Sequence, residues 1–261
     1  MLRKTNNKPM NKRIIGIIPA RYGSSRFPGK PLAMLGDKPM IQHVYERASS
    51  VLPEVAVATD DERIFNVVKA FGGVAVMTST EHRSGTDRCL EAYEKLGSEA
   101  DVIINIQGDE PFIAKSQIES VVACFEDDSV RIASLARPFD KSKGFEALFD
   151  SNLVKVVMDC ESNALYFSRS IIPYVRNYKW EEWLDHAQFF THVGLYAYAA
   201  DTLRRICRLP QSPLELSESL EQLRWLQSGY KIRMALTSEP NFGIDTPDDL
   251  AEAERFLESC L

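Results

Sequence analysis

Residues 14–31 read IIGIIPARYGSSRFPGKP, a short apolar run followed at once by a polar, glycine-containing loop. The apolar run has the length and composition of a buried parallel strand. The loop after it carries no acidic residue and three cations, Arg21, Arg26 and Lys30. Glycines in such a loop let backbone N–H groups approach an anion closely. The stretch therefore predicts a strand whose carboxyl end opens into a cradle for a ligand with several negative charges, such as a triphosphate.

This cradle differs from the phosphate-binding loop of P-loop ATPases. A Walker A loop reads G-x-x-x-x-G-K-[ST], and its hydroxyl group binds Mg²⁺. Here five residues separate Gly23 from Gly29, and Pro31 follows Lys30 where Ser or Thr should stand. The ATPase pattern fails at both positions, so any metal must be held by residues elsewhere. The alternative is an ordinary loop with solvated cations.

The chain has 261 residues, of which 44% are hydrophobic, and a formal net charge of −6. This length suits one large α/β domain, or one such domain that carries an insertion. The first 36 residues contain eight Lys or Arg and no acid, which leaves 23 bases against 37 acids in the remaining 225. A basic N-terminal segment followed by an acidic remainder argues against a nucleic-acid partner, because nucleic-acid binding would require a basic face across the domain.

The five cysteines are scattered without a C-x-x-C pair, and the four histidines show no metal-binding spacing. This usage is typical of a reduced, cytoplasmic protein without a zinc site. The apolar runs are far shorter than the roughly 20 residues that span a bilayer, and no signal peptide is evident, so we expect no membrane insertion. Residues 1–12 are polar, and we expect them to form a flexible tail.

Strand and helix patterns alternate along the first part of the chain. The pattern predicts helices at 39–50 and 62–71 and strands at 55–59 and 74–77. Asp60 and Asp61 can cap the second helix. This order indicates a three-layer α/β fold with a parallel sheet. Further along, we expect a hairpin of strands at 152–158 and 164–168, a strand at 192–198 and a helix over 214–227.

Two polar stretches follow strands and should meet at the same sheet edge as the cradle, where ligands of open parallel sheets bind. In TSTEHRSGTDR (78–88), Ser84, Gly85 and Thr86 could contact a nucleotide base, or they could only cap the next helix. In DVIINIQGDEP (101–111), Gln107, Asp109 and Glu110 follow the strand. Carboxylates beside a triphosphate suit Mg²⁺, although an acidic turn facing solvent is the alternative.

Later residues leave alternatives open. The aromatic segment 174–190 suggests a subunit interface, a lid or a small satellite core. His192 lies on a strand, where a lone histidine is more often structural than catalytic. The acidic run around Glu221 would by itself be a solvated helix face. Asp245, which precedes Thr246-Pro247, would by default cap the last helix.

Six blocks together carry a resemblance to a known family: IIPARYGSSRFPGKPL, HRSGTDR, NIQGDEP, ALYFSRSIIP, SPLE…LEQLR and GIDTPDDL. From about residue 13 to residue 257, the chain resembles the 3-deoxy-manno-octulosonate cytidylyltransferases, the CMP-KDO synthetases. The cradle and the QGDEP block are shared with sugar cytidylyltransferases in general. The SGTDR, YFSR and SPLE…LEQLR blocks are specific to the KDO family.

The resemblance implies a Rossmann-like three-layer nucleotidyltransferase fold over 13–261, with a smaller inserted dimerisation or substrate subdomain at about 150–200. It also implies a cytoplasmic homodimer that converts CTP and KDO into CMP-KDO and pyrophosphate for lipopolysaccharide biosynthesis, with Mg²⁺ as cofactor. A cytidylyltransferase for another acidic sugar is the nearest alternative, and a non-catalytic nucleotide-binding sensor is a second. KDO and a close analogue, or one and two Mg²⁺ ions, are not distinguished by the sequence.

The resemblance also assigns roles by motif. Arg21, Arg26 and Lys30 are expected to hold the triphosphate, with Asp109 and Asp245 as ligands of the metal. The residues expected near the nucleotide are Gly23, Ser24, Ser84, Gly85, Thr86 and Gln107. The residues expected to line the KDO pocket are Arg169, His192, Tyr196, Glu221 and Gln222, with Arg169 as the partner of the sugar carboxylate.

Overall fold

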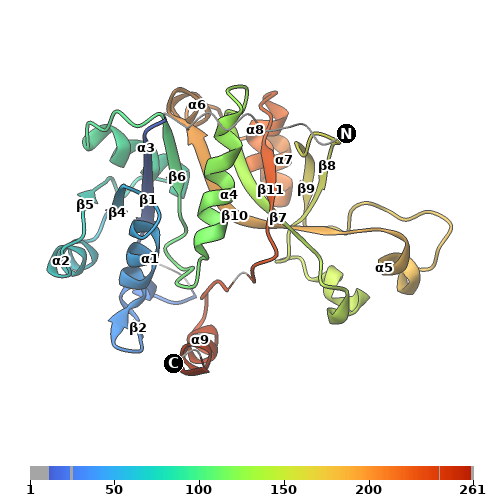
Figure 1. Cartoon of the computed structure of the whole chain (residues 1–261), viewed down its shortest axis with the longest axis horizontal. Coiled ribbons are helices and arrows are strands. Elements are labelled where there is room, and N and C mark those ends of the chain that lie inside the picture. The colour runs from blue at the N-terminus through green and yellow to red at the C-terminus, as the bar shows by residue number, and fades with distance from the viewer. Residues whose placement is uncertain (1–11, 24–25, 241, 260–261) are drawn as a thin grey trace.

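The computed structural model describes residues 12–23, 26–240 and 242–259 (Figure 1). The main sheet contains β1 (Ile14–Ala20), β4 (Glu54–Thr59), β5 (Ala75–Met77), β6 (Val102–Asn105), β7 (Ile132–Pro138), β8 (Lys155–Met158), β9 (Ala164–Ser168), β10 (Phe190–Ala199) and β11 (Arg233–Leu236). A small hairpin is formed by β2 (Met34–Leu35) and β3 (Lys38–Pro39). The helices are α1 (Met40–Ser49), α2 (Glu62–Ala70), α3 (Gly85–Lys95), α4 (Lys115–Ala123), α5 (Trp183–His186), α6 (Ala200–Ile206), α7 (Pro213–Glu218), α8 (Gln222–Gln227) and α9 (Pro247–Ser259).

The central strands run in the order β11-β7-β10-β6-β1-β4-β5. The neighbours β6, β1, β4 and β5 are parallel, and β11 is parallel to β7. Strand β10 lies between β6 and β7 and is antiparallel to both. The predicted three-layer α/β fold with a mostly parallel sheet is confirmed.

The alternation of β1 divides the core between the two faces of the sheet. Ile15 and Ile17 pack on one face with residues of α3, α6 and α8. Ile18 and Ala20 pack on the opposite face with residues of α1, α2 and α4. In Figure 1, α4 crosses in front of β10. Among the described residues, no helix is long and apolar enough to cross a membrane.

The aromatic segment divides between a core and an exposed surface. Trp183 and Phe189 pack into a separate small cluster with Phe145 and Leu148. In contrast, Tyr174 is 72% exposed. Figure 1 shows the part that carries α5 extending away from the main sheet. The proposed subdomain boundary at about 150–200 stays a prediction, because the separate apolar cluster also includes Phe139, Phe145 and Leu148, which precede that boundary.

The prediction of one continuous helix over 214–227 is wrong, because the helix is interrupted at Ser219 and forms two shorter helices, α7 and α8. Ser219 adopts a left-handed conformation with φ 51°. The Arg169 guanidinium donates to the carbonyl oxygens of Glu218 and Ser219 and thereby satisfies the end of α7. The acidic run is also not a solvated face, since Glu215 is buried against Arg224. Long-range contacts therefore override the helical pattern here.

The loop that joins β5 to α3 is fastened to that helix by Glu91. The Glu91 carboxylate accepts hydrogen bonds from the Ser79 N–H, at 2.8 Å, and from His82 Nε2. Lys95 Nζ lies 2.7 Å from its other oxygen. Burial raises the pKa of Glu91, but the bonds from Lys95, Ser79 and His82 outweigh burial and hold that pKa at about 2. The ionised carboxylate therefore stabilises the folded loop.

We expect Glu91→Gln to lower the free energy of unfolding by roughly 1–2 kcal/mol at pH 7, because a pKa unit corresponds to about 1.4 kcal/mol and the site is partly exposed. Since the folded pKa lies below the unfolded value of about 4.3, the stabilisation is complete above that value and is lost as the pH falls toward about 2. Urea unfolding at pH 7 and pH 3 measures the difference. Glu94→Gln, at an exposed position of the same helix, is the control. A Glu91→Gln deficit that is equal at both pH values would contradict this role.

Candidate active site

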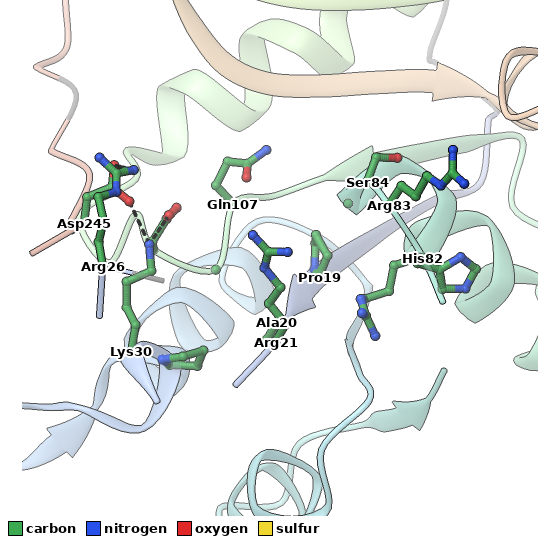
Figure 2. Close-up of a pocket in the computed structure, with 15 residues that line it drawn as sticks. Pro19, Ala20, Arg21, Arg26, Lys30, His82, Arg83, Ser84, Gln107 and Asp245 are labelled. Carbon is green, nitrogen blue, oxygen red and sulfur yellow. Dashed lines mark hydrogen bonds and ion pairs between the residues drawn. The ribbon is translucent and has the colours of Figure 1, made fainter. Parts of the chain in front are cut away.

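A pocket of about 310 Å³ lies at the carboxyl ends of β1 and β6 (Figure 2). Its lining comes from the cradle loop, from the loop before α3, from the turn after β6 and from the segment before α9. The lining residues are Pro19, Ala20, Arg21, Arg26, Lys30, Pro31, His82, Arg83, Ser84, Gly85, Arg88, Gln107, Gly108, Asp109 and Asp245. The predicted meeting of the polar stretches at one sheet edge is confirmed.

The cradle loop is closed by a backbone bond, in which the Gly29 N–H donates to the Tyr22 carbonyl at 2.9 Å. Gly29 has φ +73°, and a Cβ at this position would lie 3.0 Å from the Tyr22 ring, so the turn requires glycine. A short 3₁₀ turn begins at Lys30 and directs this lysine into the pocket. Of the two nucleotide residues predicted in the loop, Gly23 does not line the pocket and Ser24 lies outside the described residues.

Lys30 pairs with the two carboxylates that the resemblance assigns to the metal. Lys30 Nζ lies 2.6 Å from Asp109 Oδ2 and 3.0 Å from Asp245 Oδ1 (Figure 2). Arg26 Nη2 lies 2.8 Å from Asp245 Oδ2. Burial lowers the pKa of Lys30, but the two carboxylates more than offset burial, so that the net shift is upward. The Lys30 ammonium therefore stays charged at neutral pH.

Asp245 is available to a cation because other groups cap α9. The Asp249 carboxylate accepts from the backbone N–H groups of Asp245 and Thr246, at 2.9 and 2.8 Å. The Thr246 hydroxyl accepts in return from the Asp249 N–H. The default interpretation of Asp245 as the cap is therefore wrong. Its carboxylate instead points to Lys30 and Arg26.

The carboxylates fit a magnesium ion only together with a phosphate ligand. No group of three or more His, Cys, Asp or Glu that could hold a metal occurs among the described residues. Mg²⁺ at phosphate-transfer sites commonly uses one or two carboxylates, substrate phosphate oxygens and water. Asp109 and Asp245 supply this number, and the ammonium between them shows that the position favours a cation. Mg²⁺ itself stays a prediction.

The start of α3 combines a helix cap with part of the pocket wall. The Ser84 hydroxyl accepts from the Asp87 N–H at 3.1 Å and caps the helix. Gly85 lies against Pro19, where a Cβ would be 3.2 Å from Pro19 Cγ. Thr86 is buried and donates to Glu221 Oε2 at 2.8 Å. Ser84 and Gly85 thus face the pocket, whereas Thr86 lies outside its lining.

Among the ionisable side chains of the pocket wall, three were not predicted, namely His82, Arg83 and Arg88. All three belong to the same HRSGTDR block, so the block itself was the available signal. Arg88 is buried and donates to Asp60 at 2.7 Å and to the Thr78 hydroxyl at 2.6 Å. Arg88 therefore braces the ends of β4 and β5 against α3.

The residues predicted for the sugar do not line this pocket, but three of them form a polar layer next to it, in which Tyr196 is buried and His192 and Glu221 are partly buried. Burial raises the pKa of Glu221 even though Thr86 donates to it. His192 Nε2 lies 3.0 Å from the Ser134 hydroxyl, and burial lowers the pKa of His192 to about 4, so that it is neutral at pH 7. Tyr196 packs against His192, with ring centroids 5.3 Å apart.

Two contacts connect this layer to the pocket. Gln107 Nε2 donates to the Gly194 carbonyl of β10 at 3.1 Å, and Thr86 joins α3 to Glu221. Gln222 begins α8 next to Glu221 and is buried. The indole Nε1 of Trp225, in the same helix, is buried without a hydrogen-bond partner among the residues that the structure describes. Because buried polar groups are usually hydrogen-bonded, this unpaired indole N–H is available to a further polar group.

Arg169 lies apart from the pocket that Lys30 lines. Its guanidinium donates to three backbone carbonyls, those of Ser151, Glu218 and Ser219. It lines a separate apolar pocket that also includes Tyr174 and Trp180. The predicted contact of Arg169 with a sugar carboxylate stays a prediction.

Comparisons with known proteins agree with this geometry. The cytidylyltransferase family profile matches residues 15–232. The chain is 61% identical to a 3-deoxy-manno-octulosonate cytidylyltransferase of Phocaeicola vulgatus, over 94% of this chain and 98% of the relative. It is 50% identical to the Porphyromonas gingivalis enzyme of the same name, over 96% and 98% of the two chains.

A solved structure, that of CMP:2-keto-3-deoxy-manno-octonic acid synthetase complexed with CTP, superimposes with a TM-score of 0.88. The two chains are 43% identical, and the match covers 95% of this chain and 100% of the other. The two proteins are therefore similar in fold and in length as well as in sequence. The chain belongs to the cytidylyltransferase family, and within it to the 3-deoxy-manno-octulosonate cytidylyltransferases.

Proposed function

We propose that this enzyme transfers CMP from CTP to the anomeric hydroxyl of KDO and releases pyrophosphate, as a step of lipopolysaccharide biosynthesis. The observation that carries the proposal is the pocket in which Arg21, Arg26 and Lys30 face Asp109 and Asp245. Three cations suit a triphosphate, and two carboxylates suit the cation that accompanies it. The relatives named above support CTP as the nucleotide and KDO as the acceptor.

The charges of the reactants determine the mechanism. The anomeric hydroxyl oxygen of KDO attacks the α-phosphorus of CTP and releases its proton to solvent. The bond between the α-phosphorus and the oxygen that bridges to the β-phosphate breaks, and pyrophosphate leaves. The nucleotide carries about four negative charges and the sugar a carboxylate, so positioning and charge neutralisation dominate catalysis. Arg21, Arg26 and Lys30 neutralise the triphosphate and the departing pyrophosphate. No covalent intermediate with the protein is required.

Asp109 and Asp245 would hold Mg²⁺ when it is bound. The ion would supply further neutralisation of charge on the phosphate oxygens. Asp109 is held in place because the Ile244 N–H donates to its carbonyl oxygen at 2.9 Å, which also joins the turn after β6 to the segment that carries Asp245. The backbone segments that carry the two carboxylates are therefore linked directly to each other.

The polar layer of His192, Tyr196 and Glu221, together with the neighbouring Gln222, is proposed to form the acceptor side. A neutral imidazole, a phenol, a carboxyl group and an amide can all bond to sugar hydroxyls. Gln107 contacts this layer through Gly194 and also lines the CTP pocket. An acceptor bound there would lie next to the triphosphate.

The enzyme is further proposed to act in the cytoplasm as a homodimer. Phe149, Tyr174 and Trp180 are each more than half exposed, and together they line an apolar hollow with Arg169. Exposed aromatic groups of this kind are typical of subunit interfaces. Analytical ultracentrifugation of the full chain distinguishes a dimer from a monomer.

The first test measures pyrophosphate release with CTP and Mg²⁺, in the presence and absence of KDO. We expect release only when CTP and KDO are both present, because the chemistry requires an acceptor oxygen. ATP, GTP and UTP serve as nucleotide controls. Release with a different acidic sugar but not with KDO would change the substrate and keep the mechanism. CTP binding without release for any acceptor would favour a nucleotide sensor.

Lys30→Ala and Asp109→Ala are each expected to reduce turnover at least 100-fold, which corresponds to about 2.7 kcal/mol of transition-state stabilisation. Both variants should keep the circular dichroism spectrum of the wild type. Lys38→Ala is the matched control, since Lys38 pairs with Glu46 away from the pocket. Turnover of Lys30→Ala or Asp109→Ala within a few-fold of the wild type would rule out the assigned role.

A further inference from the structure

Lys30 makes a contact that the transfer reaction does not require. Its side chain is only 12% exposed, and Nζ lies within 3.0 Å of one oxygen of Asp109 and one of Asp245. These two oxygens belong to the carboxylates that the proposed function gives to Mg²⁺. The cation that should hold phosphate thus lies between the groups that should hold metal (Figure 2).

One position cannot serve both cations. Mg²⁺ binds oxygen at about 2.0–2.1 Å. An ion bonded to Asp109 Oδ2 and Asp245 Oδ1 would occupy the space between them, where Nζ lies now. The positive charges would also repel each other, and Arg26 adds a third at 2.8 Å from Asp245. Metal binding between the carboxylates therefore requires Lys30 to leave.

Of the three charged side chains Lys30, Asp109 and Asp245, Lys30 is the one that can move most easily. Asp109 is fixed through its backbone by Ile244, and Asp245 through its backbone by Asp249. Lys30, in contrast, carries its charge on a flexible four-carbon stem. Because a partly buried ammonium has lost much of its hydration, its departure from the carboxylates is favoured when another anion is within reach. A triphosphate in the cradle provides that anion.

We propose that Lys30 is an internal counter-ion that excludes the divalent cation until CTP binds. The triphosphate draws Lys30 onto its oxygens, and the carboxylates released in this way take up the metal. Nucleotide and metal binding are consequently coupled through one side chain. The inference rests on the proposed function, because it assumes that Asp109 and Asp245 are the metal ligands.

The test is a titration of the nucleotide-free full chain with Mn²⁺, which binds carboxylate sites like those of Mg²⁺ and gives an EPR signal when free. We expect Lys30→Met to bind Mn²⁺ at least tenfold more tightly than the wild type, because two carboxylates then lack their counter-ion. Lys38→Met should behave as the wild type. The double variant Lys30→Met/Asp109→Asn should lose the tight site. Thermal unfolding confirms that each variant is folded, and Lys30→Gln provides a second substitution.

The outcomes separate this inference from the proposed function. Equal Mn²⁺ affinity of the wild type and both Lys30 variants would overturn the role of Lys30 and leave CMP transfer untouched. Tight Mn²⁺ binding that survives Asp109→Asn would overturn it as well, because the ion would then lie elsewhere. If no acceptor gave pyrophosphate release with CTP but Lys30→Met still bound Mn²⁺ more tightly, the proposed CMP transfer would be rejected. The proposed role of Lys30 as a counter-ion would then still hold.

Discussion

The parallel pairing of β1 with β4 and β6 places the cradle loop and the turn that carries Asp109 at one edge of the sheet. Ile17 lies opposite Ala56 on one side and Asn105 on the other, so β6 ends beside Ile17, whereas β1 and β4 continue together to Ala20 and Thr59. The cradle therefore follows β1 at the same edge as the turn that carries Asp109. Gly108 makes this approach possible, because a Cβ there would lie 3.0 Å from the Pro19 carbonyl oxygen. The pairing of the strands and the absence of a side chain at Gly108 together bring the cations and the carboxylates into contact.

The balance of charge explains why two carboxylates lie beside the cations at a site that is suited to an anion. Three cations close together would repel one another if no anion were present, and partly buried ones also lose hydration. Asp109 and Asp245 compensate Lys30 and Arg26 at distances of 2.6 to 3.0 Å. The same two carboxylates can compensate a divalent cation instead. The proposed exchange of Lys30 for a divalent cation therefore leaves the two carboxylates compensated in both states.

The sequence predicted the features that arise from local pattern, namely the apolar strands, the loop of cations and the acidic turn at one sheet edge. It could not predict features that depend on contacts between distant residues. The helix at 214–227 reads as continuous, but Arg169, about 50 positions earlier, stabilises a break at Ser219. The pairing of Lys30 with Asp109 joins residues 79 positions apart, and no periodicity encodes it. Arg83 lies in a short loop, where neither helical nor strand periodicity gives a signal.

The antiparallel strand β10 explains how an acceptor side can be added to a nucleotide site. Tyr196 lies opposite Asn105, the last residue of β6, so the part of β10 before Tyr196 extends beyond the end of β6. That extension places Gly194 against Gln107 and carries His192 past the end of β6, where it pairs with Ala136 of β7. Strand β10 begins at Phe190, directly after Phe189 of the small apolar cluster, so this cluster is continuous with the strand that carries the proposed acceptor residues His192 and Tyr196. The proposed triphosphate cradle instead follows the parallel strand β1, so the two sides of the proposed site are carried by different strands of one sheet.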